Sequence, residues 1–412
     1  MATDDPIHVQ MGQGGIVAEA ACSCNAPHLR VGFAMAAPRF VIIGNPENRR
    51  VTMFQEELAE RSLPPAIEIA YRDMLDNPEV LDDLPDQPLW IRQESAGEDA
   101  QVHRQLLDRG FAQARAMGAA SASPDELDRN PIRHGEIRCP RQVHLGFLTM
   151  LEDIEARAKQ NSNWRLLSPT ASVAELFDKR ETSKRWRSMG IGTPECLDDV
   201  TSFDDLRERA LAKGWRSVFV KVSCASSASG LAIYRPGDTD SIMTTIEHTR
   251  DGWYNSLKLR RYNGSRVREI LEMLIGEGAQ VEGTAPKARL SGAHFDLRVV
   301  AIAGKPVFTV IRQSRHPITN LHLGGWRGDW QELLEKLSAE SLSRIDASCA
   351  RVAEATGCHS VGIDVLVEPD WQTHRIIEAN AFGDLLPRLK RRGLTVYGWQ
   401  IDSLLRAWRG AT

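Results

Sequence analysis

Two short β-branched segments near the C-terminus constrain the fold of this chain more than any other feature. Residues 361–367 and 374–380 each have the composition of a strand, and Pro369-Asp370 between them is a turn signal. The pattern predicts an antiparallel hairpin.

One face of the predicted hairpin carries three oxygen donors. If the hairpin is symmetric about Trp371, Asp364 lies directly across from Glu378, and the two-residue period of a strand puts Asn380 on the same face. Facing carboxylates repel each other unless a proton or a cation joins them. Oxygen donors from a few side chains suit Mg²⁺, which keeps several waters and takes phosphate oxygens as further ligands. The alternative is a polar outer face on a surface hairpin.

The composition limits the class of protein. The chain has 412 residues, of which 42% are hydrophobic and 26% charged, enough for two or three domains with ordinary cores. A net charge of −4 gives no reason to expect nucleic acid or an anionic membrane as a partner, and no apolar run approaches the ~18 residues of a membrane helix. The seven cysteines are scattered without the spacing of a zinc site, which predicts a cytoplasmic protein with reduced thiols.

The N-terminal part predicts a Rossmann-like domain after a loose leader. Residues 1–37 are rich in Gly and Ala and show no periodicity. Residues 40–43 form a buried-strand pattern, and a polar turn and an amphipathic helix follow, although the turn lacks the GxGxxG of dinucleotide-binding proteins. Arg92, at the end of a later strand-like segment, is either a ligand for a substrate anion or a surface arginine.

The next segment combines two lysines with a loop of small residues. Residues 171–187 are predicted to form one helix with Asp178-Lys179 inside it, and residues 216–222 a strand that contains Lys221. The small residues from Ser223 to Gly230 leave backbone N–H groups free to approach phosphate oxygens. A flexible turn is the alternative, but the adjoining lysine favours a nucleotide site.

Two further segments are rich in charge. Residues 249–277 are predicted to form a polar insertion, either a solvated basic face or a partner site. Residues 295–312 are predicted to form a second hairpin whose inward charges, on Asp296, Arg298 and Arg312, are unusual for a core strand. A helix over residues 339–356 is predicted to end at Gly357.

In this order the segments resemble the ATP-grasp superfamily, and within it the RimK-like carboxylate–amine ligases, over roughly residues 40–410. More narrowly, the chain is similar to ATP-grasp proteins that are often encoded beside radical-SAM enzymes. The motifs that carry the resemblance are Asp178-Lys179 with Gly190-Ile-Gly-Thr-Pro194, Lys221, Glu282, Phe295-Asp-Leu-Arg298, Asn320-Leu-His-Leu-Gly-Gly325, Gly362-Ile-Asp364 and Glu378-Ala-Asn380. Leu323 and the turn Ala381-Phe-Gly-Asp384 depart from the family pattern on the substrate side.

The resemblance implies an α/β fold in which α+β lobes follow an N-terminal Rossmann-like domain. After the leader, residues 38–170 would form this pre-ATP-grasp domain. Residues 171–285 would form the ATP-grasp small lobe with the nucleotide lysines and the phosphate loop. Residues 286–412 would form the large lobe with the metal and substrate site.

The resemblance also implies ATP and Mg²⁺ as cofactors, with one ion or two and with Mn²⁺ as a substitute. Asp364, Glu378 and Asn380 would bind the metal, and Arg298 and Arg312 would stabilise the transferring phosphoryl oxygens. The nucleotide would be bound by Lys179, Lys221, Ser226, Ser227, Gly230, Gln280, Glu282 and Asn320. On these assignments, Lys221→Ala should weaken ATP binding while the melting temperature of the nucleotide-free protein stays nearly unchanged.

The implied activity is ATP-dependent ligation of a carboxylate to an amine through an acyl phosphate, with release of ADP and phosphate. Two alternatives need the same ATP site: a phosphotransferase acting on a small molecule, and a nucleotide-binding module without turnover. The expected substrates are a small-molecule or peptide carboxylate and an amine, since Arg92, Arg315 and Arg388 suit a carboxylate-rich ligand. Neither nucleic acid nor a membrane is an expected partner, and an oligomer is compatible with the sequence.

Overall fold

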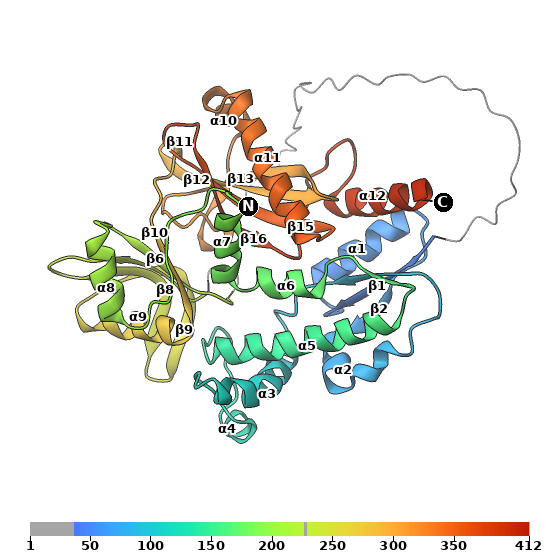
Figure 1. Ribbon diagram of the computed structural model, residues 1–412, viewed down its shortest axis with the longest axis horizontal. Coiled ribbons are helices and arrows are strands. Elements are labelled where there is room, and N and C mark those ends of the chain that lie inside the picture. Colours follow the sequence, from blue (N-terminus) through green and yellow to red (C-terminus); the bar gives the residue numbers. More distant parts are fainter. Residues whose placement is uncertain (1–36, 226–228, 412) are drawn as a thin grey trace, which may run out of the picture. The chain divides into compact units, whose positions relative to one another are not determined.

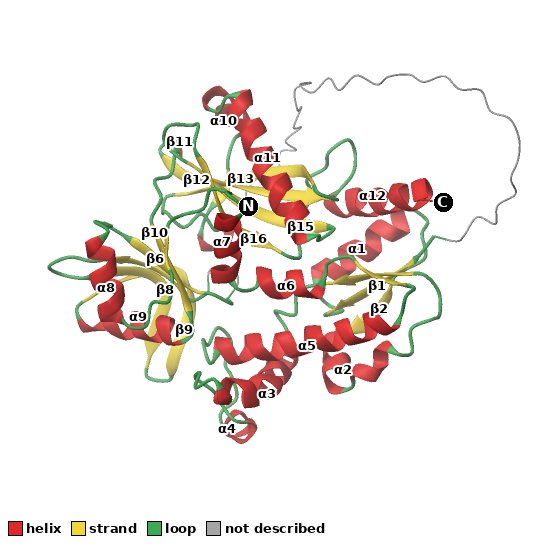
Figure 2. Ribbon diagram, viewed as in Figure 1, coloured by secondary structure: helices red, strands yellow, loops and turns green. Residues whose placement is uncertain are grey.

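The computed structural model describes residues 37–225 and 229–411, and residues 37–411 cluster as one compact unit (Figure 1). Residues 1–36 of the expected leader, with Ser226 and Ser227 of the expected phosphate loop, lie outside the described residues. Within the described part, the strands form one parallel and two antiparallel sheets with helices packed on them, so the fold is α/β as predicted (Figure 2).

The first sheet is parallel and has the order β2-β1-β3-β4. Its strands are β1 (Arg39–Gly44), β2 (Ile67–Ala70), β3 (Leu89–Gln93) and β4 (Trp164–Leu166). Successive residues of β1 enter cores on opposite faces, Val41 and Ile43 on one side and Phe40 and Ile42 on the other. A strand covered on both faces explains the continuous apolar run and confirms the Rossmann-like prediction.

The chain returns to this sheet at its C-terminal helix. Helix α1 (Arg49–Glu60) is capped by Asn48, whose side chain accepts a hydrogen bond from the Arg50 N–H at 2.9 Å. Helix α12 (Val396–Ala411) lies beside α1 (Figure 1), and the rings of Phe54 and Tyr397 are 5.4 Å apart in their shared core. The end of the chain therefore stabilises the region where the fold begins.

Helices α3 (Ala100–Ala116) and α5 (Pro140–Gln160) cross where each has a glycine, Gly110 in α3 and Gly146 in α5. A Cβ atom on Gly110 would lie 2.0 Å from the Gln142 carbonyl oxygen, and one on Gly146 would lie 1.9 Å from the Leu106 carbonyl oxygen, so the helix backbones nearly touch. The region also contains α2 (Tyr71–Asp76) and α4 (Pro124–Arg129), with the 3₁₀ turn η1 (Pro78–Leu81).

The second sheet is antiparallel, with the order β5-β10-β6-β7-β8-β9. Its strands are β5 (Cys196–Leu197), β6 (Val218–Val222), β7 (Leu231–Arg235), β8 (Ser241–Thr249), β9 (Gly252–Asn263) and β10 (Ala279–Gly283). Helices α8 (Phe203–Ala212) and α9 (Ser265–Gly276) pack on it.

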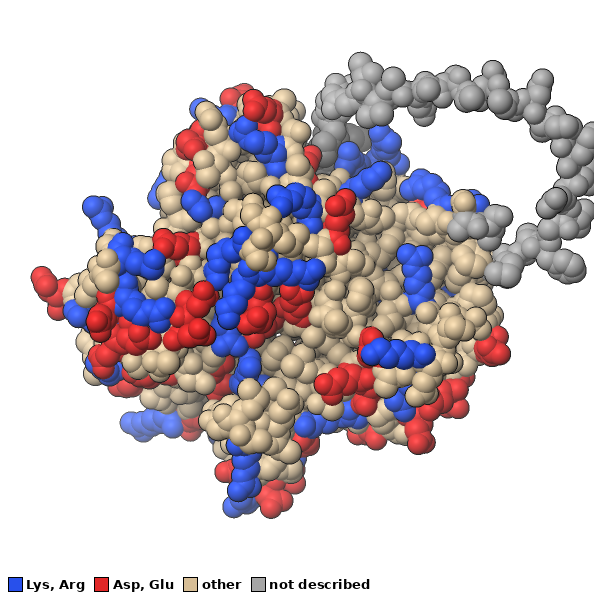
Figure 3. Space-filling view, viewed as in Figure 1, with Lys and Arg blue, Asp and Glu red and all other residues tan. Residues whose placement is uncertain are grey.

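The prediction of a polar insertion over residues 249–277 is wrong. This segment supplies the edge strand β9 and helix α9, which buries Val267, Ile270 and Leu271 in the core of the second sheet. Three of its arginines pair with neighbouring carboxylates, and Figure 3 shows the two charges side by side over this region. The ion pairs are Arg260–Glu247 at 2.7 Å, Arg266–Glu269 at 2.6 Å and Arg268–Asp204 at 2.6 Å.

The prediction of one helix over residues 171–187 is also wrong. The structure has two helices, α6 (Thr170–Leu176) and α7 (Lys179–Ser188), with a break between them. The carboxylate of Asp178 caps α7 by accepting a hydrogen bond from the Arg180 N–H at 3.0 Å. The break starts a new helix N-terminus directly before Lys179.

The loop before α5 pairs with β9, the edge strand of the second sheet. The N–H of Asn255 donates to the Gly135 carbonyl at 2.7 Å, and the N–H of Ile137 donates to the Trp253 carbonyl at 2.7 Å. Part of the edge of β9 is thereby covered by backbone hydrogen bonds.

The third sheet is antiparallel, with the order β14-β13-β12-β15-β16 and β11 paired to β12. Its strands are β11 (Arg289–Leu290), β12 (Ala293–Ile302), β13 (Lys305–Ser314), β14 (Trp326–Arg327), β15 (Ser360–Val367) and β16 (His374–Asn380). The helices nearby are α10 (Trp330–Lys336) and α11 (Ala339–Thr356), with the 3₁₀ turn η2 (Leu321–Leu323). Both predicted hairpins form, and α11 ends as predicted at Gly357, which has a φ of 63°.

Among the described residues, no helix is both long enough and apolar enough to cross a membrane. The five cysteines in the described part of the chain are unpaired thiols.

Candidate functional site

The hairpin β15–β16 places its oxygen donors as predicted. Asp364 pairs with Glu378, and Asn380 pairs with Gly362. A β-bulge makes this pairing possible. Asp364 pairs with Glu378 but the next residue, Val365, pairs with Ile376, so Ile377 is an extra residue on β16. Without the bulge, the register near the turn would set Asp364 against Ile377.

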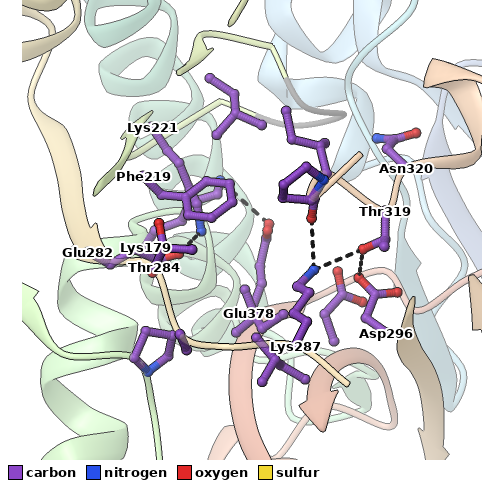
Figure 4. Close-up of a pocket in the computed structure, with 18 of the residues that line it drawn as sticks. Lys179, Phe219, Lys221, Glu282, Thr284, Lys287, Asp296, Thr319, Asn320 and Glu378 are labelled. Atoms are coloured by element: carbon purple, nitrogen blue, oxygen red, sulfur yellow. Dashed lines mark hydrogen bonds and ion pairs between the residues drawn. The ribbon is translucent and has the colours of Figure 1, made fainter. Parts of the chain in front are cut away.

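A cavity of about 310 Å³ lies against this hairpin, between strands of the second and third sheets (Figure 4). Part of its wall is apolar, which suits a flat heterocyclic group, and the rest carries charged side chains. The apolar residues include Phe219, Leu231, Ile318, Leu366 and Ile377.

Most of the predicted site residues line this one cavity, although they come from distant parts of the sequence. They are Lys179, Lys221, Glu282, Arg298, Arg312, Asn320, Asp364, Glu378 and Asn380. Gln280 and Gly230 are not among the lining residues.

Gln280 and Gly230 have local structural contacts instead. The Gln280 amide donates hydrogen bonds to the Ser183 hydroxyl at 2.6 Å and to the Lys179 carbonyl at 3.2 Å, so it holds the first turns of α7. Gly230 has a φ of +61°, and a Cβ atom there would lie 2.8 Å from a methyl carbon of Val222. A glycine is therefore needed where β7 begins.

The two lysines reach the cavity from different elements. Lys179 follows the cap of α7, and its ammonium donates to the Ala225 carbonyl and lies 3.5 Å from a carboxylate oxygen of Glu378. Lys221, on β6, forms an ion pair with Glu282 of the neighbouring strand β10. Figure 4 shows both lysines with their acidic partners on one side of the cavity.

The two arginines clamp Asp364. Arg298 Nε lies 2.8 Å and Arg312 Nη2 lies 2.9 Å from its two carboxylate oxygens. Burial would raise the pKa of Asp364, but the charges of Arg298 and Arg312 outweigh it and lower the pKa. Arg312 also holds Asp296 through two hydrogen bonds, at 2.7 and 2.9 Å.

Comparisons with solved structures identify the architecture. The ATP-grasp ligase PsnB, solved with a minimal precursor, matches with a TM-score of 0.50 over 90% of this chain and 99% of its own, at 12% identity. The chain has the ATP-grasp fold. The D-cycloserine synthetase DcsG matches with a TM-score of 0.50 over 89% of this chain and 99% of its own, at 11% identity. Neither the models of protein families nor the curated proteins give a match.

Within the ATP-grasp fold, the hairpin donors suit a hard cation. Glu378 lines the cavity, and the Asn380 amide N–H donates to the Gly362 carbonyl at 3.4 Å, which leaves the amide oxygen as an acceptor. No group of three or more His, Cys, Asp or Glu residues forms a metal site in the described segments, so an amide would have to complete the set. Both carboxylate oxygens of Asp364 lie against arginines, but Asp364 lines the cavity together with Glu378 and Asn380, so all three side chains offer an oxygen there.

The cavity also contains a lysine that the sequence predictions do not include. Lys287 follows the strand β10, and its ammonium donates to the Pro317 carbonyl at 3.0 Å and to the Thr319 hydroxyl at 3.2 Å. Desolvation lowers its pKa. Lys287 lies outside any periodic segment and is not followed by a loop of small residues, so it lacks both signals that singled out Lys221.

The arginines expected to suit a substrate lie away from the cavity. Arg92 is buried, with Nε 2.5 Å from a carboxylate oxygen of Glu94, and it also bonds the Gln400 side chain. It is therefore neither a surface arginine nor a free anion ligand. Arg315 and Arg388 are exposed and do not line the ATP-grasp cavity.

Proposed function

We propose that this chain is an ATP-dependent carboxylate–amine ligase of the RimK-like branch, which forms an amide or peptide bond. The observation that carries the proposal is one cavity in which three lysines, two arginines and the oxygen donors of a hairpin meet. Phosphoryl transfer needs this combination, because catalysis rests on positioning and on neutralising charge.

In the proposed reaction, an oxygen of the substrate carboxylate attacks the γ-phosphorus of ATP. The bond to the β,γ-bridging oxygen breaks, and ADP leaves an acyl phosphate. An amine then attacks the acyl carbon, phosphate departs, and the amine loses a proton as the amide forms.

The residues of the cavity would divide this work. Lys179 and Lys221 would hold the nucleotide phosphates, and Glu282 would meet the nucleoside end. Arg298 and Arg312 would stabilise the phosphoryl oxygens. Gln280 would act by holding α7, and Asn320 would contact the nucleotide from the third sheet. The backbone of the small-residue loop, with Ser226, Ser227 and Gly230, would cover the phosphates.

Asp364, Glu378 and Asn380 would hold Mg²⁺, one ion or two, or Mn²⁺ in its place. The bound ion would neutralise phosphate charge. Glu378 also pairs with Lys179 across the cavity, so the hairpin and the N-terminus of α7 would hold the same phosphate group from two sides.

Release of ADP by the purified protein tests the proposal. The protein is mixed with Mg-ATP and a pool of amino acids and small peptides, with and without hydroxylamine, which converts an acyl phosphate into a hydroxamate. A ligase gives ADP that depends on the pool, together with a hydroxamate. ADP without hydroxamate would indicate a phosphotransferase, and no ADP would indicate a nucleotide-binding module.

A further inference from the structure

Among the described residues, Lys287 differs from the other lysines and the arginines of the cavity because no carboxylate contacts its ammonium. Lys179 pairs with Glu378 and Lys221 with Glu282. The two arginines share Asp364 and Asp296. Within residues 37–225 and 229–411, the contacts of the Lys287 ammonium are two neutral oxygens, those of Pro317 and Thr319.

Asp296, the acidic residue linked to Lys287 through Thr319, is already occupied. Asp296 accepts two hydrogen bonds from Arg312 and a third from the Thr319 hydroxyl. Because Thr319 gives its hydroxyl proton to Asp296, its oxygen is free to accept from Lys287. The threonine therefore sets the lysine beside Asp296 without letting the two charges meet, and Figure 4 shows this chain of contacts.

One N–H of Lys287 remains for a ligand. An ammonium has three donors, and Pro317 and Thr319 take two of them. Desolvation lowers the pKa of this ammonium, and the positive charges of Arg312 and Lys221 add to that effect, whereas the carboxylates of Asp296 and Asp364 oppose it. A desolvated cation with no carboxylate in contact costs free energy that an anion in the cavity would relieve.

We propose that Lys287 binds an oxyanion of the ligand, either a phosphate of the nucleotide or the carboxylate of the substrate to be activated. The inference rests on the proposed function for the identity of these two sources. The ligand oxyanion would take the remaining N–H and lie within reach of the charges on Lys221 and Arg312.

The test uses Lys287→Met, which keeps the apolar stem and removes the charge. Lys305→Met is the matched control, since Lys305 is exposed at the start of β13 and does not line the cavity. Lys287→Arg restores the charge. The full chain and its variants are titrated calorimetrically with adenosine, AMP, ADP and ATP, and ADP release is measured against the concentration of the amino acid and peptide pool.

If Lys287 binds a phosphate, Lys287→Met weakens binding about 10- to 100-fold for the nucleotides that carry this phosphate and leaves adenosine unchanged. If it binds the substrate carboxylate, nucleotide affinities stay unchanged and the pool concentration needed for half-maximal ADP release rises by a similar factor. In both cases Lys287→Arg recovers part of the loss and Lys305→Met behaves as the wild type.

The melting temperature of the ligand-free protein separates a ligand-binding role from a structural one. Because Lys287→Met removes a desolvated charge, that temperature should stay the same or rise. The proposal would be overturned if Lys287→Met greatly lowered the melting temperature while its folded fraction, and Lys287→Arg, bound ligand as the wild type does. Lys287 would then be a structural residue. Equal binding and turnover in wild type and Lys287→Met would overturn it alone. A wild-type protein that neither binds ATP nor releases ADP would overturn the proposed function as well.

Discussion

The ion pair between Lys221 and Glu282 gives the sharpest separation of stability from ligand binding. The Glu282 side chain is 4% exposed and that of Lys221 is 14% exposed, and the second carboxylate oxygen of Glu282 is buried without a hydrogen bond. Removing Lys221 would leave this carboxylate buried and unpaired. Breaking a buried pair from one side costs about 3–5 kcal/mol, and the partial exposure of Lys221 puts the expected value at the low end.

Three variants test this reasoning by urea unfolding of the nucleotide-free protein. Lys221→Met should lose about 3 kcal/mol, whereas Lys221→Met combined with Glu282→Gln should regain most of it, because no buried charge is left. The expectation from sequence alone, that removing Lys221 leaves the melting temperature nearly unchanged, therefore does not follow from this structure. It omits the acidic partner.

The affinity for ATP should behave differently. Both Lys221→Met and the double variant should bind ATP about 10- to 100-fold more weakly, since neither restores a cation for phosphate. A Lys221→Met protein as stable as the wild type would refute the buried-charge argument. A double variant no more stable than Lys221→Met would refute it too, and unaltered ATP affinity in both would remove Lys221 from the nucleotide site.

Three further outcomes follow from other parts of the molecule. Glu378→Gln should lower Mg-ATP turnover about 10³-fold, and retained turnover would contradict this. It should change the free energy of unfolding by no more than about 1 kcal/mol, because the Glu378 side chain is 26% exposed and its partner Lys179 is 3.5 Å away. Burial lowers the pKa of His144 from 6.5 to about 4, so the unfolded chain binds a proton before the folded one does, and stability should fall by about 3 kcal/mol as the pH drops from 6.5 to 4. Acid titrations monitored by urea unfolding should show a shallower slope in that window for His144→Gln. Gly146→Ala should destabilise the protein by about 1–3 kcal/mol or more, because its Cβ atom would meet the Leu106 carbonyl. Gly276→Ala should be neutral in thermal melts, because among the described residues its Cβ atom would have no neighbour within 4 Å.

The sequence predicts local pairings well where one short pattern decides them. Asp364 and Glu378 face each other in the hairpin, and α11 ends at Gly357, because alternation and a helix-ending glycine are local signals. The predicted pairing of Asp364 with Glu378 is correct, but it depends on a β-bulge that the prediction, which assumed a regular hairpin symmetric about Trp371, did not include.

The errors arise where tertiary structure overrides the local pattern. Strand β9 is an edge strand that carries Lys258, Arg260 and Arg261, so the segment resembled a solvated insertion. The break before α7 depends on the Asp178 carboxylate, which serves as a helix cap although a continuous helical period spans it. The roles of Lys179, Lys221 and the other site residues remain predictions, and so do the domain boundaries.

The pairing of residues 133–138 with β9 provides two reporter positions for amide hydrogen exchange. The amides of Ile137 and Asn255 donate across the contact between the loop and the strand, rather than within either sheet. Their protection therefore ends whenever this contact opens, even if both sheets stay folded. The exchange rates of these two amides, compared with those of central strands such as β1 and β6, would give the free energy of that opening separately from global unfolding.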